Sequence, residues 1–135
     1  MLAKRSSLFG MAERLERGLP AISLCAHSAL MTAVANDTAA DTIFAQQIMA
    51  LGRPGDVLLT LSTSGNSRNC VLAAAAAKAR GMTVIALTGM GGGKLGQIAD
   101  ITVAVPEKET YKVQELHLPV YHALCSAVEE HFFGE

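Results

Sequence analysis

The stretch VLLTLSTSGNSRN, residues 57–69, joins a largely apolar run to a loop of small hydroxyl residues. A short run of this kind is typical of a strand in a parallel sheet that helices cover on both faces. The following segment, residues 66–80, contains five consecutive alanines, which favour a helix. The sequence therefore predicts a strand, a polar loop and a helix in direct succession, which is the repeating unit of an α/β fold.

The same alternation continues on both sides of this unit. Besides residues 57–62, strands are predicted at residues 19–24, 83–88 and 101–105. Helices are predicted at residues 3–17, 28–35, 66–80, 95–99 and 111–132, and a further helix starts with Asp37 or Thr38 as its cap and runs to about residue 51. This order predicts the α/β class, with a parallel sheet and helices on both faces, folded as one domain over residues 1–135. The carboxyl ends of the strands then share one edge, where ligands bind in such folds.

Bulk composition narrows the class of protein and its surroundings. Half of the 135 residues are hydrophobic, which is enough for one compact core, and the net charge of −1 leaves no basic face for a nucleic acid. No apolar run approaches the roughly 20 residues that span a membrane, and no secretory signal is recognised at the start. The cysteines, Cys25, Cys70 and Cys125, lie far apart in apolar sequence and are interpreted as buried free thiols. These features indicate a cytoplasmic protein without nucleic-acid or membrane partners.

The hydroxyl loop has the composition of a phosphate site. Its hydroxyl residues are Ser62, Thr63, Ser64 and Ser67. The start of the next helix adds unpaired N–H groups with a partial positive charge, and Gly65 allows the backbone to approach a ligand closely. The lysine of a nucleotide-binding P-loop is missing, so no nucleotide cofactor is expected. The alternative interpretation is an ordinary helix cap with spare hydroxyls.

Three stretches of the chain together resemble one family. GDVLLTLSTSGNSRN, ARGMTVIALTGMGGGKLGQIADITVAVP and VQELHLPVYHALC look like the sugar isomerase (SIS) domain of the phosphoheptose isomerase family. The combination of STSGNS with AND at residues 35–37 and QELH at residues 114–117 is specific to this branch. The resemblance implies a flavodoxin-like SIS fold, with residues 1–18 as a helical lead-in and residues 19–135 as the matched core.

The resemblance also implies an activity and a set of site residues. The activity would be that of an aldose–ketose isomerase in carbohydrate metabolism, which converts sedoheptulose 7-phosphate to a heptose 7-phosphate by moving protons between C1 and C2. By this resemblance Ser62, Thr63, Ser64 and Ser67 would hold the phosphate, Asp37 and Gln114 would bind the sugar, and His122 would be catalytic. Gln114 and His122 would also contribute to a zinc site. The resemblance further implies a homo-oligomer, a tetramer or a dimer.

Helical geometry is compatible with this assignment. Gln114 and His122 are eight residues apart, about 80° around a helix, so they share one side of it. His117 lies about 140° from His122 and is expected to be packed or exposed instead. Taken without the family, His122 would be interpreted as a histidine satisfied within its helix.

Some motifs of the family are missing from the 135 residues. The family has a first strand with a GNGGS-type loop and then a helix with a catalytic glutamate and a zinc-binding histidine, and none of these motifs occurs here. The chain is therefore expected to be N-terminally incomplete, or to pair strands across subunits, and to have an unpaired strand edge and an exposed apolar sheet face. Without that glutamate, the alternative to an isomerase is a non-catalytic SIS module that binds a sugar phosphate or a protein partner.

Overall fold

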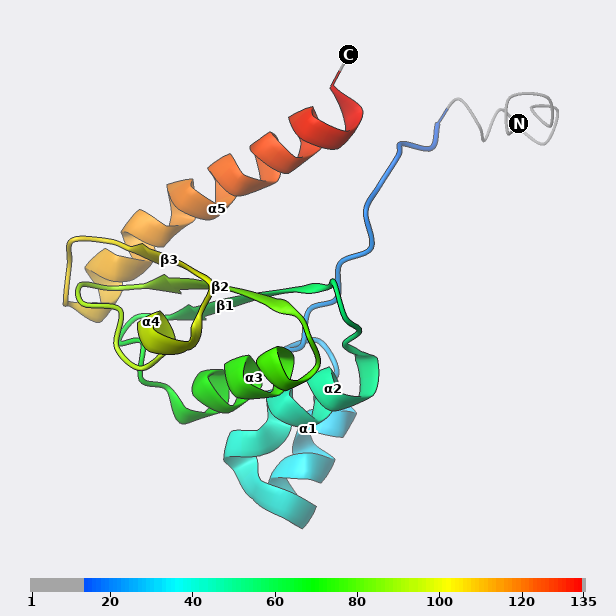
Figure 1. Cartoon of the computed structure of the whole chain (residues 1–135), viewed down its shortest axis with the longest axis vertical. Coiled ribbons are helices and arrows are strands. Elements are labelled where there is room, and N and C mark those ends of the chain that lie inside the picture. The colour runs from blue at the N-terminus through cyan, green and yellow to red at the C-terminus, as the bar shows by residue number, and fades with distance from the viewer. Residues whose placement is uncertain (1–13, 135) are drawn as a thin grey trace, which may run out of the picture.

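In the computed structural model, which describes residues 14–134, the strands form a three-stranded parallel sheet in the order β1-β2-β3 (Figure 1). The strands are β1 (Val57–Ser62), β2 (Thr83–Thr88) and β3 (Ile101–Ala104). β1 pairs with β2 along its whole length, so that Ser62 lies opposite Thr88 at the carboxyl ends of the two strands. The predicted α/β class with a parallel sheet is confirmed.

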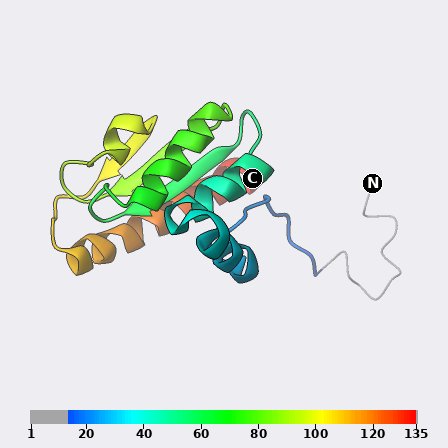
Figure 2. The ribbon, with the colours of Figure 1, turned by 90° about the horizontal axis from the view of Figure 1, so that it is seen from below.

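Helices lie on both sides of this sheet. In chain order they are α1 (Ser28–Val34), the π-helix η3 (Ala35–Ala39), the 3-10 helix η4 (Ala40–Thr42), α2 (Ile43–Leu51), α3 (Arg68–Ala79), α4 (Leu95–Ile98) and α5 (Thr110–Phe133). α1 to α4 lie on one face, and α5 runs over the other and projects beyond the sheet (Figures 1 and 2). Within residues 14–134, none of these helices combines the length and the apolar character that a bilayer crossing requires.

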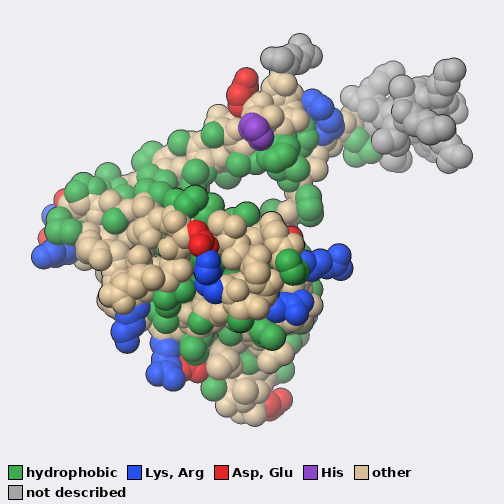
Figure 3. Space-filling model, viewed as in Figure 1, with side chains coloured by type: hydrophobic (Ala, Val, Ile, Leu, Met, Phe, Trp, Pro, Cys, Tyr) green, Lys and Arg blue, Asp and Glu red, His purple; other side chains and the backbone are tan. Residues whose placement is uncertain are grey.

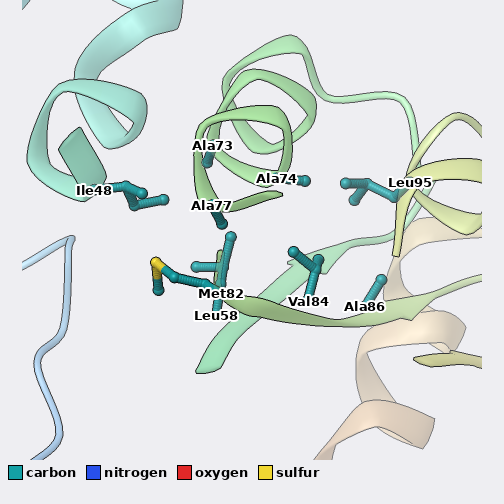
Figure 4. Packing of buried hydrophobic residues seen from close by; sticks show 9 residues of the cluster. All are labelled: Ile48, Leu58, Ala73, Ala74, Ala77, Met82, Val84, Ala86 and Leu95. Carbon is teal, nitrogen blue, oxygen red and sulfur yellow. The ribbon is translucent and has the colours of Figure 1, made fainter. Parts of the chain in front are cut away.

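The core lies between α3 and the sheet. Ala73, Ala74 and Ala77 on α3 are buried, and Ala77 points toward the strands (Figure 4). Because alanine is small, the helix packs close to the strands without a gap. The cluster is completed by Ala86 and by larger side chains from the strands, from the turn before β2 and from two other helices: Leu58, Met82, Val84, Leu95 and Ile48. The alanine run therefore brings α3 close to the sheet as well as favouring a helix.

Enlarging one of these alanines is expected to destabilise the fold. Ala74 has no exposed surface, so Ala74→Leu forces a larger side chain into filled space and should lower the unfolding free energy by about 1–3 kcal/mol. Ala75→Leu is the matched control, because Ala75 lies on the same helix but is exposed, and the two substitutions have the same helix-propensity cost. Urea denaturation measures the difference, and equal stabilities of the two variants would contradict this packing.

β1 is covered on one face only. Its even-numbered side chains face α3 and are buried, whereas Val57, Leu59 and Leu61 on the other face are 57%, 43% and 44% exposed. The prediction that helices cover both faces of this strand is therefore wrong. Only Val113 and His117 of α5 are buried, so α5 leaves this face of β1 open. β1 is also the edge strand of the sheet, and its outer side is unpaired within the described residues. The unpaired strand edge and the exposed apolar sheet face that the sequence predicts are thus both present among the described residues.

The segment before α1 does not form the predicted strand. Residues 19–24 are irregular, and no strand within residues 14–134 pairs with them. A strand exists only where a neighbouring backbone completes its hydrogen bonds, so apolar composition is insufficient here. The helix predicted at residues 3–17 is not present at residues 14–17, and the rest of that prediction lies outside the described residues.

The irregular segment connects α1 with the far end of α5 instead. The Nη2 of Arg17 donates to the carbonyl oxygen of Phe133 at 3.0 Å, and its guanidinium lies 5.0 Å from the centre of the Phe133 ring. Figure 3 shows hydrophobic side chains on both sides of an opening between α5 and the rest of the molecule. The outer part of α5 thus contacts this segment, and the face of the sheet beside it stays open.

The helix break predicted at Asn36 and Asp37 occurs later in the chain. Helical backbone continues through both residues as η3 and becomes extended only at Ala39, with φ −163° and ψ 134°. The prediction that Asp37 or Thr38 caps a helix is therefore wrong, since α2 starts at Ile43. The π-helix follows α1 directly, so its first N–H groups already have acceptors and need no cap. Asp37 is consequently an exposed side chain on a continuous helical segment.

The three cysteines are free, but they are not all buried as predicted. Cys25 and Cys125 are exposed, and Cys70 is partly buried. Apolar neighbours in sequence do not ensure burial here, because Cys125 lies on the exposed part of α5.

One carboxylate connects α3 and β2. Asp100 forms an ion pair with Lys78 of α3, and its Oδ2 accepts the N–H of Val84 in β2 at 2.8 Å. These contacts, first the lysine and then the backbone N–H, hold the pKa of Asp100 below its ordinary value. Because the folded state favours the carboxylate, this stabilisation is fully present above the unfolded pKa of about 4 and is lost as the pH falls through the lowered folded pKa.

Asp100→Asn is expected to lower the unfolding free energy at neutral pH and to have less effect in acid. The variant cannot form the ion pair with Lys78, whereas in the wild type that pair weakens once Asp100 is protonated. Urea midpoints of both proteins, measured from about pH 7 down to about pH 3, test the expectation. A stability difference that stays constant over this range would show that the charge of Asp100 contributes nothing.

Candidate functional site

The loop between β1 and α3 starts at a buried serine. Ser62 is the last residue of β1, and its carbonyl oxygen accepts the N–H of Gly65 at 2.9 Å, which closes a tight turn. Gly65 has φ +64°, the left-handed region in which glycine is favoured. The hydroxyl of Ser62 donates to the hydroxyl of Ser67 at 2.9 Å. The turn therefore folds the loop back on itself and brings its first and last hydroxyl groups together.

The first turn of α3 keeps backbone donors available. Ser67 precedes α3, but its side chain makes no capping hydrogen bond to the helix. The backbone N–H groups of Arg68 and Asn69 have no acceptor among the described residues. A helix start with free N–H groups carries a partial positive charge and attracts anions. The alternative interpretation, in which Ser67 is an ordinary cap of α3, therefore does not agree with the structure.

A glycine-rich loop, residues 89–94, holds the serine loop in place. The Oδ1 of Asn66 accepts the N–H of Lys94 at 3.1 Å, and the carbonyl oxygen of Gly65 accepts the N–H of Leu95 at 2.9 Å. The carbonyl oxygen of Thr63 accepts a further N–H from the start of the glycine-rich loop, also at 2.9 Å. In each of these hydrogen bonds the donor is a backbone N–H group. The shape of the serine loop is therefore fixed before any ligand binds.

A cavity of about 420 Å³ opens between this loop and α5. One wall consists of residues at the end of β1 and in the loop, and the other wall consists of residues of α5: Leu61, Ser62, Thr63, Ser67, Gln114, His117 and Tyr121. Among these lining residues, none carries a carboxylate that would repel an anion. Hydroxyl and N–H donors at a helix start suit a phosphate group, and the amide, imidazole and phenol opposite suit the hydroxyls of a sugar.

Four of the predicted site residues line this cavity: Ser62, Thr63, Ser67 and Gln114. The other three do not. Ser64 is exposed, and its hydroxyl accepts the N–H of Asn66 at 3.1 Å. Asp37 is exposed on η3, and His122 is exposed on α5, where its ring lies edge-on to that of Tyr121 with 5.0 Å between the ring centres. The structure therefore brings together three of the phosphate candidates and Gln114, and the binding and catalytic roles of all seven residues stay predictions.

Comparison with known proteins defines the family. Residues 4–89 match the SIS domain family. The chain is 46% identical over 132 residues to the phosphoheptose isomerase of Thiobacillus denitrificans, a match that covers 96% of this chain and 67% of that protein. This chain belongs to the phosphoheptose isomerase family of SIS domains. It is also 44% identical over 131 residues to the phosphoheptose isomerase of Alteromonas mediterranea, with 95% and 66% of the two chains covered.

A solved structure confirms the fold of this SIS domain. The phosphoheptose isomerase GmhA from Neisseria gonorrhoeae superimposes with a TM-score of 0.80 at 43% identity, covering 82% of this chain and 62% of that chain. The SIS domain described here therefore spans about two thirds of the length of its curated relatives. The resemblance found in the sequence and the fold class that it implies are both confirmed.

Two residues of the cavity wall, His117 and Tyr121, were not among the predicted site residues. His117 and Tyr121 lie three and seven positions after Gln114, about 60° and about 20° away from it around the helix. His122 is eight positions away and lies about 80° from Gln114 in the opposite sense. Gln114, His117 and Tyr121 are separated by three, four and seven positions, a spacing that places side chains on one face of a helix. This spacing was the signal in the sequence that could have identified this wall of the cavity.

The described residues do not by themselves form a zinc site. Residues 14–134 contain no cluster of three or more histidine, cysteine, aspartate or glutamate side chains that could hold a metal ion. Gln114 lines the cavity but His122 does not. Zinc sites are almost always four-coordinate, and two protein donors are too few to fix the metal.

Proposed function

We propose that this SIS domain binds a phosphorylated sugar and acts in aldose–ketose isomerisation, with sedoheptulose 7-phosphate as the favoured substrate. The observation that carries the proposal is the cavity between the serine loop and α5, which is lined by hydroxyl groups up to Ser67, the residue that directly precedes α3 and its free N–H groups. A dianionic phosphate accepts hydrogen bonds from both kinds of donor. The sugar then extends along α5 toward Gln114 and Tyr121.

The proposed reaction moves a proton between two neighbouring carbons of the sugar. A base removes a proton from C1 of the ketose while the C2 oxygen takes up a proton, which gives an enediol. A proton is then delivered to C2 while the C1 hydroxyl loses its proton, so that the carbonyl is re-formed at C1. By the family resemblance we assign one of these proton transfers to His122, which directly follows the cavity residue Tyr121 on α5 and is exposed. The phosphate stays at the serine loop, so it anchors the substrate away from the reacting carbons. Gln114 offers an amide donor for a sugar oxygen.

A non-catalytic role is the second candidate. His122 does not line the cavity, and no carboxylate lines it to serve as the second acid or base. A module that only binds a sugar phosphate needs the phosphate donors but not a proton-transfer pair. The described geometry supports phosphate binding more directly than it supports the isomerisation step.

We also propose that the protein is a homo-oligomer in the cytoplasm. Leu118, Val128 and Phe132 on α5 are 47%, 43% and 56% exposed, and apolar side chains of this size on a projecting helix favour association with another surface. The free thiols of Cys25 and Cys125 are exposed, which suits a reducing compartment. Analytical ultracentrifugation of the purified protein tests the oligomeric state.

Turnover of sedoheptulose 7-phosphate tests the proposed function. The protein is incubated with the substrate, with and without zinc, and formation of the aldose is followed for the wild type and for His122→Ala. We expect the substitution to reduce turnover by about 100-fold or more. His131→Ala is the matched control, because His131 is an exposed histidine near the end of the same helix.

The outcomes separate the two candidate functions. Turnover that survives His122→Ala would remove the proposed role of His122. Binding of the substrate without turnover would support the non-catalytic module. Absence of both binding and turnover would overturn the proposal.

A further inference from the structure

A histidine on the cavity wall is held in one orientation by the end of β2. His117 lies on α5, its side chain is only 3% exposed, and its Nε2 is 3.1 Å from the carbonyl oxygen of Thr88. The same carbonyl oxygen accepts the N–H of Val105 at 2.9 Å. A carbonyl oxygen only accepts hydrogen bonds, so Nε2 of His117 must carry a proton. The anchor therefore fixes both the plane of the ring and the tautomer of the neutral imidazole.

The other ring nitrogen of His117 is left as an acceptor. In the neutral imidazole with a proton on Nε2, Nδ1 has a lone pair and no proton. No described residue donates a hydrogen bond to Nδ1, and within residues 14–134 the only fully buried side-chain polar atom without a partner is the hydroxyl of Thr88. Since Nδ1 has no partner and is not in this fully buried class, it must be partly accessible to solvent. Because His117 lines the cavity with Ser62, Ser67 and Gln114, the cavity is where that access lies.

An oriented acceptor at this place selects for a particular chemical group. The serine loop and the start of α3 supply hydroxyl and N–H donors, which suit phosphate oxygens. Phosphate oxygens carry lone pairs and would face the lone pair of Nδ1, so they are poor partners for the neutral ring of His117. A hydroxyl group of a sugar donates a proton and is a good partner. The cavity thus has a phosphate wall and, opposite it, one fixed acceptor for a hydroxyl.

We propose that His117 is a specificity-determining residue whose Nδ1 accepts a hydrogen bond from a ligand hydroxyl close to the phosphate. This inference rests on the proposed function, since it assumes that a phosphate ester occupies the cavity. The hydroxyl concerned is the one on the carbon next to the phosphate-bearing carbon, because His117 shares the cavity with Ser62 and Ser67. The residue acts on substrate choice and takes no part in proton transfer.

Small phosphate esters test this inference without any need for turnover. The probes are inorganic phosphate, propyl phosphate and glycerol 3-phosphate, of which only the last has a hydroxyl on the carbon next to the phosphate-bearing carbon. Calorimetric titration of the wild type is expected to give glycerol 3-phosphate an affinity about five- to tenfold above that of propyl phosphate, the contribution of one neutral hydrogen bond.

His117→Gln separates the acceptor from the anchor. The amide nitrogen of glutamine reaches the position of Nε2 and can still donate to Thr88, but glutamine has no acceptor at the position of Nδ1. We expect the variant to bind inorganic phosphate as the wild type does and to bind the two esters equally well. His131→Gln applies the same substitution to an exposed histidine of α5 and is expected to keep the wild-type preference.

The possible results are distinguishable. If the wild type binds none of the three probes, the proposed function fails and this inference fails with it. If the wild type binds phosphate but the preference for glycerol 3-phosphate is absent, or persists in His117→Gln, the role of His117 is wrong while the phosphate site stands.

A spectroscopic measurement covers the case in which His117→Gln does not fold. Nitrogen NMR of the imidazole in the wild type distinguishes an unprotonated Nδ1 from a protonated one. We expect the His117 Nδ1 signal of the free protein to be that of a bare lone pair and to shift on addition of glycerol 3-phosphate but not of propyl phosphate. A protonated Nδ1 in the free protein, or equal responses to both esters, would overturn the inference.

Discussion

Gly65→Ala is expected to destabilise the fold and to abolish the binding of phosphate esters. A Cβ atom at Gly65 would lie 2.1 Å from the carbonyl oxygen of Gly92, and the residue has φ +64°. The opposing atom is backbone, so it cannot rotate away, and the glycine-rich loop would have to move as a unit. That movement would break the hydrogen bonds that Lys94 and Leu95 donate to the serine loop. We expect the unfolding free energy to fall by at least about 2 kcal/mol and the phosphate affinity to fall by more than about 100-fold.

Gly91→Ala is the matched control for this substitution. Gly91 also has a positive φ, +89°, but a Cβ atom there would meet nothing within 4 Å. The control therefore measures the cost of the left-handed conformation alone, about 1–2 kcal/mol, without displacing the serine loop. Urea denaturation and calorimetric titration compare the two variants. Equal losses of stability and of affinity would contradict the close contact between the two loops.

Ser67→Ala should weaken the binding of a sugar phosphate by about 10- to 150-fold. The hydroxyl of Ser67 lines the cavity and accepts a hydrogen bond from Ser62, so its own proton is available for a phosphate oxygen. A hydrogen bond to a charged group contributes about 1.5–3 kcal/mol, which corresponds to this range of affinity. Calorimetric titration with sedoheptulose 7-phosphate measures the change, and thermal unfolding checks that the variant is folded.

Ser64→Ala is the companion variant, because the sequence and the structure differ in what they indicate for this residue. The sequence groups Ser64 with the phosphate-binding hydroxyls, but in the structure the side chain is exposed, does not line the cavity and accepts the N–H of Asn66. We therefore expect its affinity to change by less than about threefold. A loss larger than that of Ser67→Ala would show that the loop rearranges when phosphate binds, and the cavity described here would then not be the bound form.

Most of the fold could be predicted from the sequence, because local signals and tertiary packing agree there. The predicted strands at residues 57–62 and 83–88 are β1 and β2 with the same bounds, since each is an apolar run between turn residues. The helix predicted from the alanine run is α3 to within two residues at each end, and it stops before Gly81, which has φ +73°.

The elements that differ depend on neighbours that a local pattern does not contain. Residues 19–24 have the composition of a strand, yet no described strand pairs with them. The apolar run of β1 predicts cover on both faces, yet Leu59 and Leu61 are exposed because α5 buries few side chains against the sheet. An apolar run shows that a segment is able to form a buried strand. Whether the strand forms and is buried depends on the neighbouring elements that are available to pack against it.

The candidate site was predictable on the wall formed by the loop, and at one position of the wall formed by α5. Four hydroxyl residues within six positions at the end of a strand indicate a phosphate loop, and Ser62, Thr63 and Ser67 do line the cavity. Which residues form the other wall depends on how α5 is rotated about its own axis. The family motif alone does not determine that rotation. Gln114 was identified, whereas His117 lies on the cavity and His122 does not.

An amide NMR titration of the isotope-labelled protein tests most directly whether the serine loop binds the phosphate of a sugar phosphate. With sedoheptulose 7-phosphate, the backbone amide signals of Arg68 and Asn69 should shift and saturate together, because phosphate oxygens would accept from the free donors at the start of α3. Unphosphorylated sedoheptulose at the same concentration should leave these signals unchanged. If these signals stay in place with the phosphorylated sugar, or if the shifts are confined to residues away from the serine loop, the assignment of this cavity to phosphate is contradicted.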